Sequence, residues 1–336
     1  MEGMRNVVKR IAMNLTTLKY IVALDNYRNF VKAAEACGVS QPSLSTAIKN
    51  MEAELDIRIF DRDAHPVKPT AIGEKIIAMA RVTLHNAAQI EEFVKGERGE
   101  EGGDLNLGII PTIAPYILPD LFRELHRSHP AVKLKVSEMR TSAIVEKLVN
   151  AELDMAILAT PLERKELLEI PLYYEKFEAY VSPEDALWTQ KEVFSDQLPS
   201  DRLWVLQEGH CLRSQVFKFC HRKSRTHAEY EAGSIDTLVR VVDANGGYTV
   251  IPELHVSFLS ESQKSNVRPI TGRMPAAVAG GESEPCPACV PVREVSLVIR
   301  EDFVRERLLN IVATAVKNII PEPMLDSRLK KFAIKI

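Results

Sequence analysis

The chain has no apolar run that approaches the roughly 18 residues of a membrane-spanning helix, and its first residues lack the apolar region of a signal peptide. We therefore expect a protein that stays in the cytoplasm and has no membrane partner. Cysteine is also scarce, with five in 336 residues. Cysteines in a reducing compartment seldom build a disulfide framework, so any disulfide here should be transient.

An excess of positive charge is missing as well. The net charge is −3, which by itself argues against nucleic-acid binding. The charge is unevenly distributed, however, because residues 1–50 carry seven Lys and Arg against three Asp and Glu, a net +4, and the remainder carries −7. Any phosphate-binding surface should therefore be local and N-terminal.

Three short helices are predicted near the N-terminus. The first is capped by Thr16 or Thr17, the second ends at Gly38, and the third begins with Ser40 as N-cap and Pro42 in its first turn. Apolar residues recur at helical spacing in all three. The second and third helices are separated by only a few residues, which is the spacing of a helix-turn-helix.

In such a motif the N-terminal part of the second helix enters the major groove. The polar residues of that part suit base edges and phosphates, and they are Gln41, Ser43, Ser45, Thr46 and Lys49. Residues 56–70 contain Arg62, Lys68 and two prolines, and they predict a wing beside the groove. A small helical bundle with a solvated polar face is the alternative interpretation.

Residues 71 to about 95 predict one long helix of about 37 Å that links and dimerises. Glycine and glutamate in 96–103 end it. Beyond Gly103, strands and helices alternate, which indicates an open α/β sheet in two lobes with room for a ligand between them. We expect a DNA-binding domain at 13–70, a linker helix at 71–98 and a regulatory domain at 103–336. Lobe I should span about 103–172 and 293–325, and lobe II about 173–292, with a mobile loop at 274–291.

Cys211 and Cys220 lie nine positions apart and form the strongest indication of redox chemistry. His210 and Arg213 flank the first sulfur, and helical spacing from Leu212 onward places it at a helix start. Both features favour the thiolate, so we predict a pKa below that of a free thiol. Cys220 is close enough in sequence to trap an oxidised product. The alternative is an inert buried cysteine.

The other cysteines carry weaker signals. Cys37 shares a helix face with apolar residues and is interpreted as core packing. Cys286 and Cys289 form a single C-x-x-C, and two ligands do not complete a zinc site. We expect no metal and no cofactor.

Three motifs resemble the winged helix-turn-helix of LysR-type transcriptional regulators. They are Ala33-Ala34 followed by Ser40-Gln41-Pro42-Ser43-Leu44-Ser45, then Ile59-Phe60-Asp61-Arg62, then Thr70-Ala71-Ile72-Gly73. The resemblance implies an α/β protein: an N-terminal winged helix-turn-helix, a linker helix, and a regulatory domain of two α/β lobes like a periplasmic binding protein. The expected DNA-binding residues are Ser40, Gln41, Pro42, Ser43, Ser45, Thr46, Lys49, Arg62, Lys68 and Thr70. Asp56 and Pro69 stand where the family usually has Gly and Leu, which leaves the shape of the wing less defined.

Three further segments, 110–116, 138–141 and 208–220, resemble family members that sense hydrogen peroxide. The resemblance implies that Thr112, Thr141, Gly209 and His210 surround the peroxide, that Cys211 reacts with it, with His210 and Arg213 beside it, and that Cys220 resolves the product. The insertion at 274–291 is foreign to this pattern.

The implied protein is an activator of oxidative-stress genes and not an enzyme. Its partners would be double-stranded promoter DNA, RNA polymerase, further copies of itself in a dimer or a tetramer, and glutaredoxin or thioredoxin as reductant. Two alternatives remain. A LysR-type regulator that binds a small metabolite between the lobes would not need the cysteine pair, and a thiol peroxidase would need an active-site motif that we do not find.

Overall fold

The computed structural model describes residues 14–97, 102–219, 232–273, 285–286 and 290–332. Contacts group the chain into an N-terminal unit that ends at residue 100 and also takes in 150–152, and a C-terminal unit formed by the rest. Within the described residues, no helix is both long and apolar enough to cross a membrane.

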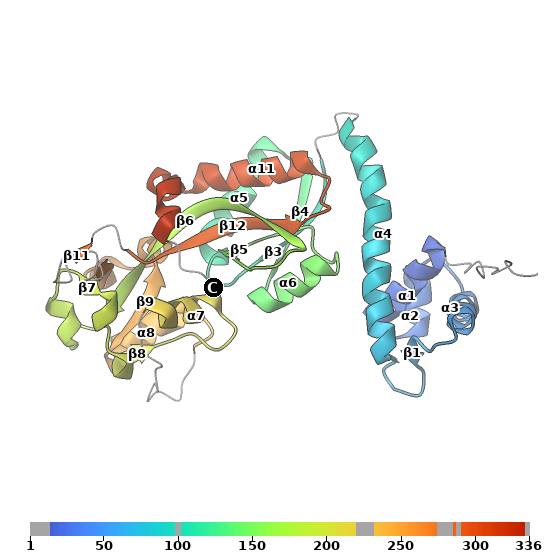
Figure 1. The fold of residues 1–336 in the computed structure, drawn as a ribbon, viewed down its shortest axis with the longest axis horizontal. Helices are drawn as coiled ribbons and strands as arrows, with labels where there is room; N and C mark the ends of the chain where they lie inside the picture. Colours follow the sequence, from blue (N-terminus) through green and yellow to red (C-terminus); the bar gives the residue numbers. More distant parts are fainter. Residues whose placement is uncertain (1–13, 98–101, 220–231, 274–284, 287–289, 333–336) are drawn as a thin grey trace, which may run out of the picture. The chain divides into compact units, whose positions relative to one another are not determined.

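The N-terminal unit begins with three helices, α1 (Leu15–Tyr27), α2 (Phe30–Ala36) and α3 (Gln41–Leu55) (Figure 1). Ser40 is the N-cap of α3, as predicted, and its side chain accepts a hydrogen bond from the Ser43 N–H. The predicted cap of α1 is wrong by two or three residues. Asn14 is the N-cap, and its Oδ1 accepts the Thr17 N–H at 2.8 Å. The helices share one apolar core, which includes Leu18, Ile21, Leu24, Ala33, Leu44, Ile48 and Phe60.

The predicted wing is a two-stranded antiparallel ribbon of β1 (Phe60–Asp61) and β2 (Lys68–Pro69). The long helix α4 (Ala71–Glu97) follows at once. It packs on the core through Ile77 and Ala80. Part of the apolar stripe expected for α4 faces outward, because Ile90 is 69% exposed. The expectation that Cys37 packs on the core is confirmed.

A mixed sheet organises the C-terminal unit. Among the described strands, its main path runs β11-β10-β6-β12-β5-β3-β4, with β9 and then β8 joined to β6, and β7 joined to β10. These strands are β3 (Gly103–Ile109), β4 (Val132–Glu138), β5 (Met155–Thr160), β6 (Leu167–Val181), β7 (Val193–Phe194), β8 (Leu203–Trp204), β9 (Tyr248–Pro252), β10 (Val267–Arg273), β11 (Pro285–Cys286) and β12 (Val292–Arg300). Part of the loop expected at 274–291 is therefore strand β11, paired with β10.

Two buried clusters define two lobes within this unit. In lobe I, α5 (Ala114–Ser128) and α11 (Glu306–Ile319) pack side by side, and α6 (Thr141–Val149) contacts β5 and β12 (Figure 1). Lobe II contains α7 (Cys211–Phe219), α8 (Ile235–Asn245) and the 3₁₀ helix η4 (Glu253–Phe258). The long strand β6 serves both lobes, since its first part pairs with β12 and its last part with β9 and β10.

Candidate functional site

Cys211 is the first residue of α7, so the helix begins where the sequence predicts. The chain enters the helix through Gly209 and His210. Gly209 has a φ of +92°, a backbone conformation that favours glycine, and a Cβ there would lie 2.9 Å from Cδ of the flexible Arg140 side chain. The Cys211 side chain is almost fully buried and is a free thiol.

A buried ion pair provides the charge that acts on this thiol. Glu175 on β6 and Arg293 on β12 are register partners, and neither is exposed. Arg293 Nε and Nη2 lie 2.7 Å and 2.6 Å from Glu175 Oε2. Arg293 Nη1 donates to the Thr112 hydroxyl at 3.1 Å, and Nη2 donates to the Thr112 carbonyl at 2.9 Å. The Glu175 carboxylate also accepts the Leu254 N–H at 2.9 Å, so the pair joins the loop of Thr112 to η4.

Opposing influences act on the pKa of Cys211. Burial raises the pKa and is the largest of them, whereas Arg293, the hydroxyls of Thr141 and Thr112, and the Leu212 N–H lower it. The net direction is upward, so the predicted lowering is wrong. A helix start and a nearby cation are both present, but a fully buried sulfur loses the water that would otherwise stabilise its thiolate.

The residues that flank Cys211 in the sequence do not supply the charge expected of them. Arg213 Nη1 donates to the Leu206 carbonyl at 3.0 Å, and its guanidinium lies 5.4 Å from the centre of the Phe217 ring. Burial and the Arg140 charge lower the pKa of His210, so its imidazole is neutral near pH 7. Arg293 was not among the predicted site residues, although a charged pair, Arg293-Glu294, between the apolar Val292 and Val295 was a visible signal.

Four residues expected around a peroxide lie close to Cys211. Thr112 follows β3 and Thr141 begins α6; both hydroxyls act on the thiol. The Thr141 hydroxyl is buried and has no oxygen or nitrogen partner within the described residues, which leaves it available to the sulfur. Gly209 and His210 precede Cys211 directly.

Two of the predicted cysteines, Cys220 and Cys289, lie outside the described residues. The residues that the structure describes contain no group of three His, Cys, Asp or Glu side chains suited to a metal ion.

Helix α3 presents most of the expected DNA-binding side chains to solvent. Gln41, Pro42, Ser43, Thr46 and Lys49 are exposed, and Ser45 is half-buried. On the wing, Lys68 is exposed in β2. The Ser40 hydroxyl lies 2.7 Å from that of Ser43 and caps the helix.

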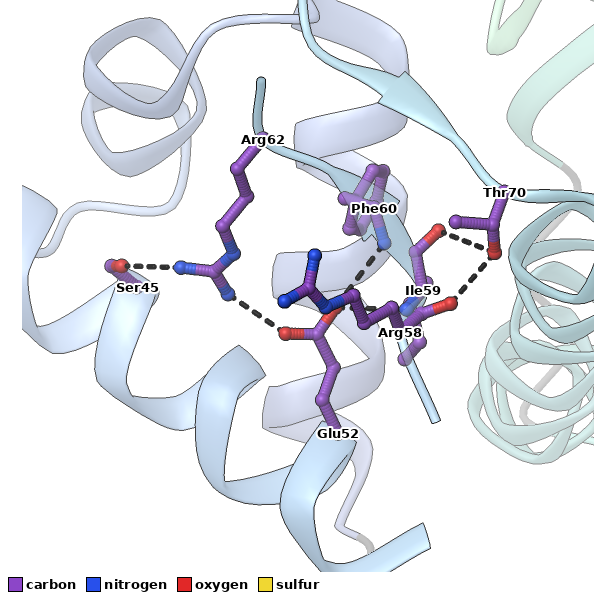
Figure 2. Close-up of polar contacts among 7 residues, drawn as sticks. All are labelled: Ser45, Glu52, Arg58, Ile59, Phe60, Arg62 and Thr70. Atoms are coloured by element: carbon purple, nitrogen blue, oxygen red, sulfur yellow. Dashed lines mark hydrogen bonds and ion pairs between the residues drawn. The ribbon is translucent and has the colours of Figure 1, made fainter. Parts of the chain in front are cut away.

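Arg62 and Thr70 make contacts within the unit, as Figure 2 shows. Arg62 Nη2 is 2.8 Å from Glu52 Oε2, and Nη1 is 3.5 Å from Ser45 Oγ. The Thr70 hydroxyl donates to the Arg58 carbonyl at 2.6 Å and accepts the Gly73 N–H at 3.0 Å. Both side chains therefore tie the wing to the helices beside it.

Comparison with known proteins identifies the class. Residues 15–74 match the family model "Bacterial regulatory helix-turn-helix protein, lysR family", and residues 98–312 match "LysR substrate binding domain". The chain belongs to the LysR family of transcriptional regulators, and its fold is that of the family, with a winged helix-turn-helix and a regulatory domain of two α/β lobes.

Within this family the chain resembles OxyR. It is 32% identical over 313 residues to the "Hydrogen peroxide-inducible genes activator" of Haemophilus influenzae, covering 92% of this chain and 99% of the relative. A full-length OxyR variant of Pseudomonas aeruginosa is 32% identical, with a TM-score of 0.74 and coverage of 91% and 98%. A Corynebacterium glutamicum OxyR variant with bound hydrogen peroxide is 28% identical, with a TM-score of 0.56 and coverage of 91% and 92%. The chain is thus an OxyR-like DNA-binding regulator.

Proposed function

We propose that this regulator senses hydrogen peroxide through Cys211 and transmits the signal to promoter DNA by forming a reversible disulfide with Cys220. The observation that carries the proposal is the buried thiol at the start of α7, within reach of the Arg293 charge and of the Thr112 and Thr141 hydroxyls. An inert core cysteine needs no such polar surroundings. The relatives named for hydrogen peroxide support the choice of signal.

The chemistry proceeds in two steps. The Cys211 thiolate attacks one oxygen of the peroxide, the O–O bond breaks, and the departing hydroxide takes up a proton to leave as water. The sulfur is then a sulfenic acid, which the Cys220 thiol attacks to form the disulfide and release a second water. Arg293 stabilises the thiolate, while Thr112, Thr141 and the neutral His210 are suited to hold the peroxide in line and to stabilise the leaving oxygen.

The raised pKa of Cys211 sets a condition on the first step. Only a minor fraction of the thiol is ionised near pH 7, so the rate depends on the groups that stabilise the thiolate. Arg293, which lowers the pKa of Cys211, therefore has a larger role in the first step than Arg213.

The second step requires α7 to change shape. The helix holds nine residues, Cys211–Phe219, so at about 1.5 Å per residue its last Cα lies about 12 Å from that of Cys211. Consecutive Cα atoms are about 3.8 Å apart, so while α7 is intact the Cα of the residue after Phe219 lies at least about 8 Å from the Cα of Cys211. A disulfide requires a Cα separation of about 4.4–6.8 Å. Disulfide formation therefore unravels part of α7, and the buried Leu212 and Val216 leave their places in lobe II.

Such a rearrangement can reach the DNA through the assembly. Exposed apolar side chains on α4, namely Met79, Ile90 and Phe93, suit pairing with a second copy. We propose a dimer built on α4 and a tetramer in which the regulatory domains change their contacts on oxidation. The oxidised form would act in the cytoplasm on promoter DNA with RNA polymerase, and glutaredoxin or thioredoxin would reduce it again.

Hydrogen exchange and footprinting of the same samples test this function. Peroxide should convert the amides of residues 205–219 from protected to rapidly exchanging and should shift the DNase footprint on one promoter. Cys211→Ser should abolish both responses, whereas the double variant Cys286→Ser, Cys289→Ser should keep them. Unchanged exchange on oxidation would rule out the switch, and a footprint that responds to a metabolite but not to peroxide would favour the alternative regulator.

A further inference from the structure

The wing of the DNA-binding unit is attached to α3 through one buried carboxylate. Glu52 lies on α3 and is 9% exposed. Its Oε1 accepts the backbone N–H groups of Ile59 at 2.8 Å and Phe60 at 3.2 Å, where the wing begins. Its Oε2 binds Arg62 Nη2 at 2.8 Å (Figure 2). One side chain of the helix thus fixes both the backbone and a side chain of the wing.

Arg62 completes a bridge back to the helix. Its second terminal nitrogen lies 3.5 Å from Ser45 Oγ, at the long end of the hydrogen-bond range, and its guanidinium lies 5.4 Å from the centre of the Phe30 ring. The Arg62 side chain is 29% exposed. The guanidinium therefore contacts Phe30 on α2 and both Ser45 and Glu52 on α3, and less than a third of the Arg62 side chain is exposed to solvent.

We infer that Arg62 acts in DNA recognition as a positioning residue that works through Glu52 and Ser45, and not as a phosphate ligand. The planar guanidinium reaches Glu52 and Ser45 with separate nitrogens, and this geometry sets the angle of the wing to α3 and the orientation of the Ser45 hydroxyl. Lys68, which is exposed on β2, is the matched candidate for a direct phosphate contact. The inference rests on the proposed role of residues 41–49 in contacting DNA.

The variant Arg62→Lys separates a phosphate ligand from a positioning residue. A phosphate ligand needs a charge, which lysine supplies, whereas a bridge to two partners needs the two-nitrogen fork of arginine. Glu52→Gln is the complementary variant, because its amide oxygen still accepts the Ile59 and Phe60 N–H groups while the ion pair to Arg62 is lost.

The test measures affinity against salt concentration for the full-length protein. The probes are a duplex that the wild-type protein selects from random-sequence DNA and a scrambled duplex of the same composition. Arg62→Lys, Arg62→Met and Glu52→Gln should each weaken binding to the selected duplex by roughly 5- to 150-fold, with the salt slope unchanged. The double variant Arg62→Met, Glu52→Gln should be no weaker than the weaker single variant. Lys68→Met should weaken binding to both duplexes and reduce the salt slope by about one.

Wild-type affinity for Arg62→Lys, together with a slope reduced by about one for Arg62→Met, would overturn the inference, because Arg62 would then be a phosphate ligand. Thermal unfolding of each variant identifies any that fail to fold. Because Arg62 is only partly buried, Arg62→Lys and Arg62→Met can still be compared with each other if Glu52→Gln unfolds. Gln41→Ala tests the recognition helix separately. Full affinity in Gln41→Ala and in Ser45→Ala would contradict the proposed contact of α3 with DNA. The comparison of Arg62→Lys with Arg62→Met would still show whether Arg62 binds a phosphate.

Discussion

Arg293 on β12 donates a 3.1 Å hydrogen bond to the hydroxyl of Thr112, and both side chains are buried. Thr112 lies in the loop after β3 of lobe I, whereas Arg293 pairs with Glu175 where β12 meets β6. Arg293 and the Thr112 hydroxyl both lower the pKa of the Cys211 thiol, against the larger effect of burial. Reactivity at Cys211 is therefore linked to the pairing of β12 with β6, the strand that serves both lobes.

Replacing Arg293 with methionine should slow the reaction with peroxide. Arg293 lowers the pKa of Cys211 against the effect of burial, so its loss raises the pKa further. Each unit of increase reduces the thiolate near pH 7 by about tenfold. Stopped-flow rates should fall at pH 7 and recover as the pH rises, while Arg213→Met should change them little. Because Arg293→Met leaves Glu175 buried without its partner, the variant is best made with Glu175→Gln as well. Equal losses for the two arginines would contradict the assignment.

Removing the hydroxyl of Thr141 should weaken the same step. Valine has nearly the same shape, and the hydroxyl is buried without an oxygen or nitrogen partner in the described part of the chain, so little else is lost. A hydrogen bond to a charged group contributes about 1.5–3 kcal/mol, which corresponds to a rate reduction of roughly 10- to 150-fold for Thr141→Val. The neighbouring exposed Ser142→Ala serves as control. A wild-type rate in Thr141→Val would exclude its hydroxyl from the reaction.

The buried amide of Gln215 should destabilise α7 in the reduced protein and so make the unravelling of this helix easier. It is 0% exposed in α7, and neither its amide oxygen nor its amide nitrogen has a partner within the described residues. Burial of an unpaired polar group costs about 1–3 kcal/mol, so Gln215→Leu should raise the free energy of unfolding of the reduced protein by about that amount. Disulfide closure should become slower while the first reaction with peroxide keeps its rate. Exposed Ser214→Ala is the control, and a less stable Gln215→Leu protein would refute this account of α7.

The recognition helix should lose specific affinity when its polar side chains are shortened. Ser45→Ala is expected to weaken binding to the specific site by about 1–3 kcal/mol and to leave dimerisation intact. Footprinting and sedimentation of the same variant provide the two measurements. A footprint unchanged by Ser45→Ala and Gln41→Ala together would mean that α3 does not read the DNA.

The local parts of the fold could be predicted because their signals are local. Ser40, Pro42 and Gly38 mark helix boundaries through their own backbone and side-chain chemistry, and the structure uses them so. The start of α7 at Cys211 followed from apolar spacing within nine residues. The cap of α1 failed because Asn14 and two threonines compete within four residues, and each can accept a backbone N–H.

The central charge of the site could not be found in the same way. Arg293 is 82 residues from Cys211 in the sequence, and Glu175 is 118 residues from Arg293. Their meeting depends on the register of β6 and β12. Strand β12 is buried along almost its whole length and β6 has no regular alternation of buried and exposed residues, so neither strand shows in the sequence which residues face each other. The sign of the Cys211 pKa shift depends in turn on burial, which the sequence near the cysteine does not encode.

The proposed switch between Cys211 and Cys220 can be tested by counting free thiols in the fully reduced protein after one equivalent of hydrogen peroxide. The wild-type chain has five cysteines, and it should lose two thiols, with mass spectrometry placing the new disulfide between Cys211 and Cys220. Cys220→Ser should react at a near-normal rate and lose one thiol as a sulfenic acid, and Cys211→Ser should keep all its thiols. Two thiols lost in Cys211→Ser, or none lost in the wild type, would rule out the disulfide switch.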